Sequence, residues 1–210
     1  MRLKLAALGF LTVSIVVASA NTVQAIPRTI VLVSKTQAIQ PSTYYPPDLE
    51  IPSGIVIEAA PSEAELAEPA AHALSVMFQA AYQAGLTPVL LSGYRSYASQ
   101  EVLYRNALQN LGEFQNSVAP PGHSEHQLGL AADIGSFGVF CPAQTCFAFT
   151  REAVWFQAHA HSYGFIQRYP LRTELVTGYT YEPWHYRYVG VRLANVLYRS
   201  GQTLDEYSEH

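Results

Sequence analysis

The sequence predicts a single α+β domain in which helices pack against a small antiparallel sheet. Hydrophobic residues make up 49% of the 210 residues and charged residues only 13%, which suits one compact domain with a sizeable core. Segments with helical spacing alternate with short strand-like segments, but not in the regular βαβ order of a parallel sheet. No internal repeat or low-complexity tract interrupts this pattern.

Residues 1–25 have the features of a secretory signal peptide. Arg2 and Lys4 precede an apolar run over 5–20, and the small residues up to Ala25 suit a cleavage site. The apolar run falls short of the ~20 residues that a spanning helix needs, which favours a cleaved signal over a retained anchor. No other segment could cross a membrane. We therefore expect an exported protein, located in the periplasm or at the cell wall.

The composition limits the partners and the redox chemistry. The net charge of −4 and the lack of a basic patch argue against a nucleic-acid partner, and nothing indicates more than a monomer. Cys141 and Cys146 are the only cysteines, and export to an oxidising compartment favours a local disulfide between them. Free thiols and metal ligation are the alternatives, although a zinc site built from cysteines would need more of them.

After the signal peptide, residues 26–51 are rich in Pro, Ser and Thr and are expected to wrap the domain as an extended segment. Apolar periodicity, N-cap residues and terminal glycines then mark the elements of a domain over 52–210. Strand-like runs are expected over 30–33, 55–57, 86–91, 165–169 and, as a pair, within 178–188. Helices are expected over 70–84, from Ser96 or Ser99 to 111, from Thr150 to 163, over 191–200, and after a capping box of Thr203 and Glu206. Residues 113–121 and 135–149 are expected to be loops.

Two polar clusters stand out from this framework. His126 lies seven residues before Asp133 with Gly129 between them, and about fifty residues further on the chain carries Glu182 and His185. Two imidazoles and one carboxylate can hold a zinc ion, leave a fourth position for water and keep the charge of the site near +1. A spare carboxylate can take the proton of that water. The pattern predicts a catalytic zinc site with Glu182 as the base.

Each of these residues also has an ordinary explanation. A lone histidine more often forms a hydrogen bond at the surface or in the core, Asp133 could cap a turn, and Glu182 could pair with Arg187 at the surface. The spacing of Glu182 and His185 raises a further question, because residues three apart in a regular strand point to opposite faces. Pro183 and the neighbouring aromatic residues argue against a helix. A bend at Pro183 is therefore required if both side chains are to reach one site.

Four motif blocks, taken in order, resemble one known family. They are Ser92-Gly93-Tyr94-Arg95-Ser96; Ser124-Glu125-His126-Gln127-Leu128-Gly129-Leu130-Ala131-Ala132-Asp133; Tyr163-Gly164-Phe165 with Arg168-Tyr169-Pro170; and Glu182-Pro183-Trp184-His185-Tyr186-Arg187-Tyr188-Val189-Gly190. In these blocks the chain closely resembles the VanY-like D-alanyl-D-alanine carboxypeptidases, over roughly residues 52–207. Members of that family are zinc peptidases that share a fold with the Hedgehog signalling domain. The resemblance implies the same Hedgehog/DD-peptidase-like fold, a Zn²⁺ cofactor and peptidoglycan stem peptides as partners.

The resemblance also implies a role for each matched residue. The zinc ligands would be His126, Asp133 and His185, and Glu182 would be the general base and acid. Arg95 matches an arginine that faces the substrate and stabilises the oxyanion, where developing charge needs a donor. Ser124 matches a contact to the terminal carboxylate of the substrate, and Gln100 matches a glutamine of the substrate site.

Several residues near these motifs have more than one interpretation. Trp184 is expected to wall the site, with a plain core role as the alternative. His123 either contacts the substrate or His126, or simply belongs to a turn. Arg168 is expected to form a structural ion pair rather than to act in catalysis. The remaining histidines are expected to be structural or exposed: His72, His159, His161 and His210. The chain departs from the family pattern in the loop of Cys141 and Cys146 and in the turn Leu171-Arg172-Thr173, either of which could alter substrate preference.

The motifs and the export signal together predict an exported zinc carboxypeptidase that removes the C-terminal D-alanine from peptidoglycan stem peptides. An L,D-carboxypeptidase or a murein endopeptidase would use the same chemistry, because the named residues do not decide the stereochemistry before the cut. A cell-wall binding module that keeps the zinc without turnover is the alternative from another class. The presence of both Glu182 and Arg95 argues against that alternative.

Overall fold

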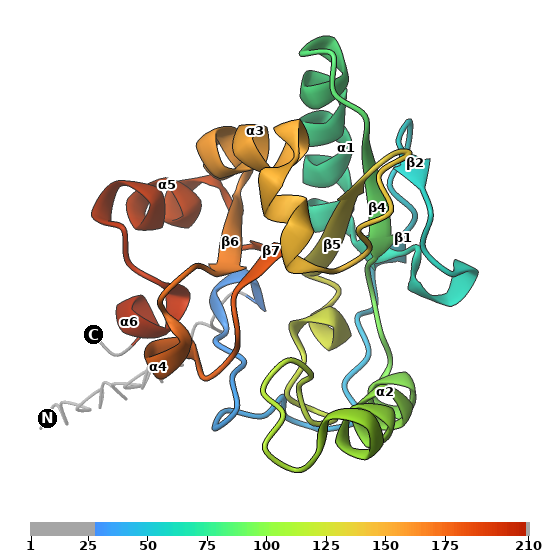
Figure 1. Ribbon diagram of the computed structural model, residues 1–210, viewed down its shortest axis with the longest axis vertical. Coiled ribbons are helices and arrows are strands. Elements are labelled where there is room, and N and C mark those ends of the chain that lie inside the picture. Colours follow the sequence, from blue (N-terminus) through green and yellow to red (C-terminus); the bar gives the residue numbers. More distant parts are fainter. Residues whose placement is uncertain (1–27, 209–210) are drawn as a thin grey trace, which may run out of the picture.

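The computed structural model describes residues 28–208, so the predicted signal peptide and His210 lie outside the described residues. The centre of the fold is a five-stranded sheet in the order β2-β4-β5-β7-β6 (Figure 1). These strands are β2 (Val56–Ile57), β4 (Pro88–Ser92), β5 (Ala131–Ser136), β7 (Glu182–Tyr188) and β6 (Phe165–Tyr169). Neighbouring strands run antiparallel except β2 and β4, which run parallel. The predicted α+β class is confirmed, but the sheet is mixed because of this one edge strand.

Helices cover the sheet and its ends. They are α1 (Glu68–Gln83), α2 (Tyr97–Leu111), α3 (Arg151–His159), α4 (Glu174–Thr177), α5 (Val191–Ser200) and α6 (Leu204–Ser208). Short 3-10 turns join them: η1 (Arg28–Ile30), η2 (Pro61–Glu63), η3 (Glu125–Leu128), η4 (Thr145–Phe149) and η5 (Ala160–Tyr163). Helices α1 and α3 lie side by side over the sheet, and α5 lies beyond β6. Helix α2 lies at the end of the molecule opposite to α1 and α3 (Figure 1). A second, two-stranded sheet pairs β1 (Leu49–Glu50) with β3 (Leu66–Ala67).

The main core forms where α1 and α3 meet the sheet. The apolar stripe predicted for the first helix is the buried face of α1: Ala70, Ala71, Leu74, Met77, Phe78 and Ala81. The ring of Phe78 lies 5.8 Å from that of Phe156 on α3, and Phe156 lies 5.6 Å from Tyr186 on β7. Burying one such large apolar side chain contributes about 1.5–3 kcal/mol, so this contact chain fixes the two helices on the strands that carry the polar motifs.

The local signals for the starts of α2, α3 and α6 are confirmed, whereas the helix expected to run to residue 163 ends at His159 and continues as the 3-10 turn η5. The side chain of Ser96 accepts a hydrogen bond from the backbone N–H of Ser99 at the start of α2, and Thr150 caps α3 in the same way. Thr203 and Glu206 form the reciprocal contacts of a capping box before α6. Cys141 and Cys146 are joined in a disulfide, within the loop between β5 and α3. Within residues 28–208, no helix combines the length and the apolar character needed to cross a membrane.

Three predictions of secondary structure are wrong. The run 30–33 forms no strand: Ile30 belongs to η1, and the carbonyl oxygens of Val31 and Val33 accept hydrogen bonds from arginine side chains instead of from a neighbouring strand. The segment 178–188 holds one strand, β7, rather than a pair, and its partners are the distant strands β5 and β6. The loop after Asp133 starts later than expected, since β5 continues to Ser136.

Candidate active site

Three elements bring His126, Asp133 and His185 together. His126 lies on the 3-10 turn η3, Asp133 lies on β5, and the antiparallel register of β5 and β7 places His185 directly opposite Asp133. The Nε2 atom of His126 lies 3.4 Å from Oδ2 of Asp133, and Nδ1 of His185 lies 3.1 Å from Oδ1. All three residues are buried, and their ligand atoms lie within 4.8 Å of one another. The predicted set therefore forms one group that could hold a metal ion.

The turn between η3 and β5 depends on Gly129. This residue has a φ of +69°, a left-handed conformation that favours glycine, and its N–H donates to the carbonyl oxygen of His126. A Cβ atom added here would lie 2.9 Å from the backbone nitrogen of Ala67 on β3. Only glycine fits both the conformation and the space, so Gly129 fixes where η3 ends and hence where His126 lies.

The second nitrogen of each imidazole is also held. Nδ1 of His126 lies 2.5 Å from the carbonyl oxygen of Gly93, to which it donates a hydrogen bond. Nε2 of His185 lies 3.3 Å from Oε2 of Glu125. These contacts leave Nε2 of His126 and Nδ1 of His185 facing Asp133. Outer contacts of this kind orient the histidine ligands of metal sites and set their tautomers.

An irregularity in β7 places Glu182 on the same side as His185. Along β6, the paired residues change from Gln167–Tyr186 to Tyr169–Glu182. Between these two pairs β7 contains more residues than β6, so β7 bulges. As a result, Oε2 of Glu182 lies 3.9 Å from Nδ1 of His185. The bend that Pro183 must provide is thus present as a bulge in an extended strand. Glu182 is buried, and burial, supported by the nearby carboxylates, raises its pKa to about 8.

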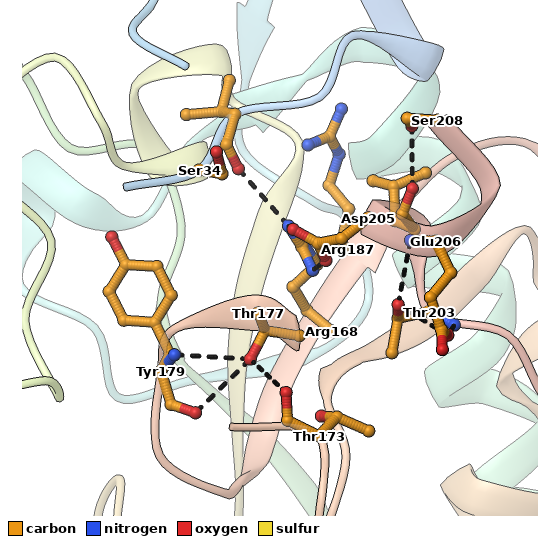
Figure 2. A network of polar contacts seen from close by, with 12 residues as sticks. Ser34, Arg168, Thr173, Thr177, Tyr179, Arg187, Thr203, Asp205, Glu206 and Ser208 are labelled. Atoms are coloured by element: carbon orange, nitrogen blue, oxygen red, sulfur yellow. Dashed lines mark hydrogen bonds and ion pairs between the residues drawn. The ribbon is translucent and has the colours of Figure 1, made fainter. Parts of the chain in front are cut away.

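A buried ion cluster lies behind His185. Its centre is Glu125, whose Oε1 accepts hydrogen bonds from Nε of Arg168 at 2.8 Å and from Nη1 of Arg187 at 2.7 Å. Arg168 also contacts Asp205 of α6, and Figure 2 shows these two side chains facing each other. Burial would raise the pKa of Glu125, but the two guanidinium groups outweigh it and hold that pKa far below its usual range. Arg168 has the ion-pairing role expected of it.

Arg95 is held by a second polar group. Its Nε lies 3.3 Å from Oε1 of Glu63, its Nη2 donates to the hydroxyl of Ser92 at 2.8 Å, and its Nη1 donates to Oε1 of Gln100 at 3.1 Å. The same guanidinium lies 4.0 Å from Oδ2 of Asp133. Arg95 is therefore fixed beside the three candidate ligands with its planar group restrained on three sides.

These residues surround a cavity of about 360 Å³. Its lining includes nearly every predicted site residue: Arg95, Gln100, Ser124, His126, Asp133, Glu182, Trp184 and His185. His123 is not among the lining residues; its Nδ1 donates to the carbonyl oxygen of Ser34 at 2.8 Å. His72 and His159 are exposed, and His161 is half-buried in a separate, larger hollow.

The sequence did not predict a role in the site for four residues. Glu125 contacts His185, and Glu63 contacts Arg95; both glutamates come from segments distant in the sequence from their partners. Tyr169 and Tyr179 line the cavity, and their rings contact each other at 4.9 Å. The one available signal was the place of Glu125, directly before the first candidate ligand.

The chemistry of the three candidate ligands fits zinc. Burial lowers the pKa of His126, so its imidazole is neutral, as a ligand must be. The adjacent histidines outweigh burial at Asp133 and hold the pKa of this carboxyl well below its usual range, so it is ionised. Two imidazoles and one carboxylate are the ligand set of many catalytic zinc sites.

Comparison with known proteins also indicates a zinc peptidase. A family model described as VanY, D-alanyl-D-alanine carboxypeptidase, matches residues 63–191. The chain is 41% identical to the carboxypeptidase-like protein YodJ of Bacillus subtilis, over 90% of this chain and 70% of that protein. It is 37% identical to a D-alanyl-D-alanine carboxypeptidase of Enterococcus faecalis, over 64% of this chain, and it spans about half of that relative, 52%.

Solved structures support both the fold and the metal. One of them is the LdcB LD-carboxypeptidase, whose solved structure reveals how that protein recognises peptidoglycan. It is 42% identical to this chain, with a TM-score of 0.78, and the match covers 85% of this chain and 84% of that one. A VanY D,D-pentapeptidase solved in complex with Zn(II) is 31% identical with a TM-score of 0.66, covering 86% of this chain and 98% of that one. The expected fold is confirmed, and zinc is the metal of this site. The chain belongs to the VanY family of D-alanyl-D-alanine carboxypeptidases.

Proposed function

We propose that this protein is an exported zinc carboxypeptidase that removes the C-terminal D-alanine from peptidoglycan stem peptides. One observation carries the proposal: the carboxylate of Glu182 lies beside His185, in the same cavity as all three candidate ligands. A site that only stored a metal would have no use for a second carboxylate that is not a metal ligand in this place. The name of the Enterococcus faecalis relative supports the choice of substrate.

Each group of the site has a separate role in peptide hydrolysis. When bound, zinc supplies a Lewis acid for the scissile carbonyl and lowers the pKa of the attacking water. Glu182 takes the proton of that water and returns it to the departing amine. Arg95, held by Glu63 and Ser92, donates to the oxygen on which negative charge develops.

Other residues of the cavity bind the end of the substrate. Ser124 and Gln100 both line it, and we assign them contacts to the terminal D-alanine, with Ser124 donating to its carboxylate. Trp184 forms a wall beside His185. Because a carboxypeptidase must recognise a free carboxylate, a hydroxyl donor near the cationic Arg95 suits this end of the peptide.

A second candidate function differs only in stereochemistry. The chain is more similar to the LdcB LD-carboxypeptidase, at 42% identity, than to the zinc-bound VanY structure, at 31%. This difference favours the cleavage of an L,D bond in tetrapeptides as the alternative. An endopeptidase cut in a cross-link would use the same groups. A zinc-holding module without turnover is disfavoured, because Glu182 and Arg95 are both in the cavity.

Mass spectrometry of defined stem peptides tests the proposal. The zinc-loaded protein is incubated with a pentapeptide ending in D-Ala-D-Ala, with a tetrapeptide and with a cross-linked dimer, each with and without a chelator. We expect loss of one D-alanine from the pentapeptide, and no loss with chelator. Shortening of the tetrapeptide alone would favour the L,D alternative. If the zinc-loaded protein cleaved none of the three, the enzymatic proposal would be wrong.

A further inference from the structure

Tyr179 has a feature that the proposed mechanism does not use. The residue is only 2% exposed and lines the active cavity, yet its hydroxyl has no hydrogen-bond partner within residues 28–208. Most buried polar groups in proteins are paired, and leaving one unpaired costs free energy. An unpaired hydroxyl in the wall of an active cavity therefore requires an explanation.

The fold holds this side chain firmly. The backbone N–H of Tyr179 donates to the hydroxyl of Thr177 at 3.3 Å, and that hydroxyl lies 3.1 Å from the carbonyl oxygen of Thr173 (Figure 2). One side of the ring packs on Tyr169, and Nζ of Lys35 lies 4.8 Å from the ring centre. In Figure 2 the hydroxyl points away from the threonine contacts. The aromatic ring is thus fixed at its base and on its faces, while its hydroxyl has no partner among the described residues.

The charges around Tyr179 decide what its hydroxyl could bind. Burial, and then the carboxylates of Glu125 and Glu182, raise the pKa of Tyr179, so the hydroxyl keeps its proton and can donate a hydrogen bond. The ionised Glu125 would repel an anion, and the nearby cation Arg168 is already paired with Glu125 and Asp205. A neutral acceptor is therefore favoured here, whereas the terminal carboxylate of a peptide suits the cavity near the cationic Arg95.

We infer that Tyr179 is a substrate-contacting residue whose hydroxyl donates a hydrogen bond to a neutral backbone carbonyl of the bound peptide, upstream of the scissile bond. The inference deepens the proposed function and rests on it. An upstream carbonyl is the acceptor that a stem peptide offers and a free D-Ala-D-Ala dipeptide does not, because the only peptide carbonyl of the dipeptide is the scissile one. Tyr179 would therefore help to select peptides over the dipeptide.

Tyr186 provides a matched control. Its hydroxyl is also buried and without a partner in the described chain, and the residue is 0% exposed. It lines the separate hollow of about 540 Å³ formed mainly by α3, η5, β6 and α5 rather than the active cavity. Tyr179→Phe and Tyr186→Phe each remove one unpaired hydroxyl and keep the ring. Neither variant is expected to lose stability, since no hydrogen bond is broken.

The experiment measures the binding of peptides to the zinc-loaded protein by calorimetry. A Glu182→Gln background slows turnover by about 10²–10⁴-fold, so dissociation constants are obtained whether or not the parent cleaves the peptide. We expect Tyr179→Phe to weaken binding of the pentapeptide about 10-fold, as loss of one well-formed hydrogen bond does, and to leave dipeptide binding unchanged. Tyr186→Phe should change neither constant.

Two results would overturn the inference. One is a pentapeptide dissociation constant that Tyr179→Phe leaves unchanged, as expected if an ordered water satisfies the hydroxyl. The other is an equal loss of affinity for pentapeptide and dipeptide, which would place the contact at the scissile end. Cleavage by the parent protein tests the proposed function separately, so a failure of one is not a failure of the other.

Discussion

Glu125 offers the sharpest test of how the metal site is supported. Its side chain is fully buried, and it contacts His185, Arg168 and Arg187. Glu125→Gln keeps the shape of the side chain but removes its charge. We expect this variant to lose both stability and zinc affinity, because the same carboxylate compensates two buried guanidinium groups and orients one candidate ligand.

The size of the loss in stability depends on the contacts that Arg168 and Arg187 keep in the Glu125→Gln variant. Arg168 retains the carboxylate of Asp205, so it is not left without a counter-charge. Within residues 28–208, Arg187 retains only backbone carbonyl oxygens, those of Thr29, Val31 and Tyr188. One buried charge is therefore left uncompensated, which costs about 3–5 kcal/mol. Loss of the contact that orients His185 should weaken zinc binding by about 10–100-fold.

Urea unfolding of the metal-free protein measures the first effect. With a dependence of about 2 kcal/mol per molar urea, the midpoint should fall by about 2 M. Glu101→Gln is the control, since it breaks an exposed pair with Arg105 that is worth about 0.5 kcal/mol or less. Competition with a chelator measures the zinc affinity. A midpoint and a zinc affinity equal to those of the control would refute the reasoning about the cluster.

Three further predictions concern the site and its surroundings. Glu182→Gln should lower kcat by about 10²–10⁴-fold while the zinc content stays that of the parent, measured by steady-state kinetics and metal analysis; wild-type kcat would exclude Glu182 as the base. Burial lowers the pKa of His185, but hydrogen bonds to Asp133 and Glu125 raise it to about 9 in the metal-free protein, so zinc must displace a proton below that pH. Zinc affinity should thus rise with pH up to about 9 with release of a proton, and calorimetry in buffers of different ionisation enthalpy would show no such release if the assignment is wrong. Replacing Cys141 and Cys146 together by serine should cost up to about 2 kcal/mol, since the disulfide closes a short loop, and unchanged thermal unfolding would show that the bond adds no stability.

The parts of the fold that depend on local chemistry could be predicted from the sequence. Ser96 and Thr150 start their helices because their hydroxyls pair with N–H groups three residues on, a contact that needs nothing from the rest of the chain. The run 30–33 shows the opposite case. Its β-branched residues suit a strand, but its carbonyl oxygens bind arginine side chains from β6 and β7, a tertiary contact that no local pattern reveals.

The candidate site divides in the same way. His126, Asp133, His185 and Glu182 could be predicted as one group because their residue types match one chemistry. Glu125 could not, since a glutamate beside a histidine is usually exposed, and its burial depends on two arginines more than forty residues away. The bulge in β7 also needed the structure, because it arises from the register between two strands rather than from Pro183 alone.

The contacts of residues 29–34 have a consequence for the order in which the protein becomes active. Carbonyl oxygens of Thr29 and Val31 bind Arg187, and that of Val33 binds Arg168. These acceptors precede the family match, which begins at residue 63, whereas the arginines lie near its end. Residues made early thus complete a cluster formed by residues made much later. The support of the zinc site is finished only after Arg187 has been made, so a nascent chain that ends before this residue would have an immature catalytic centre.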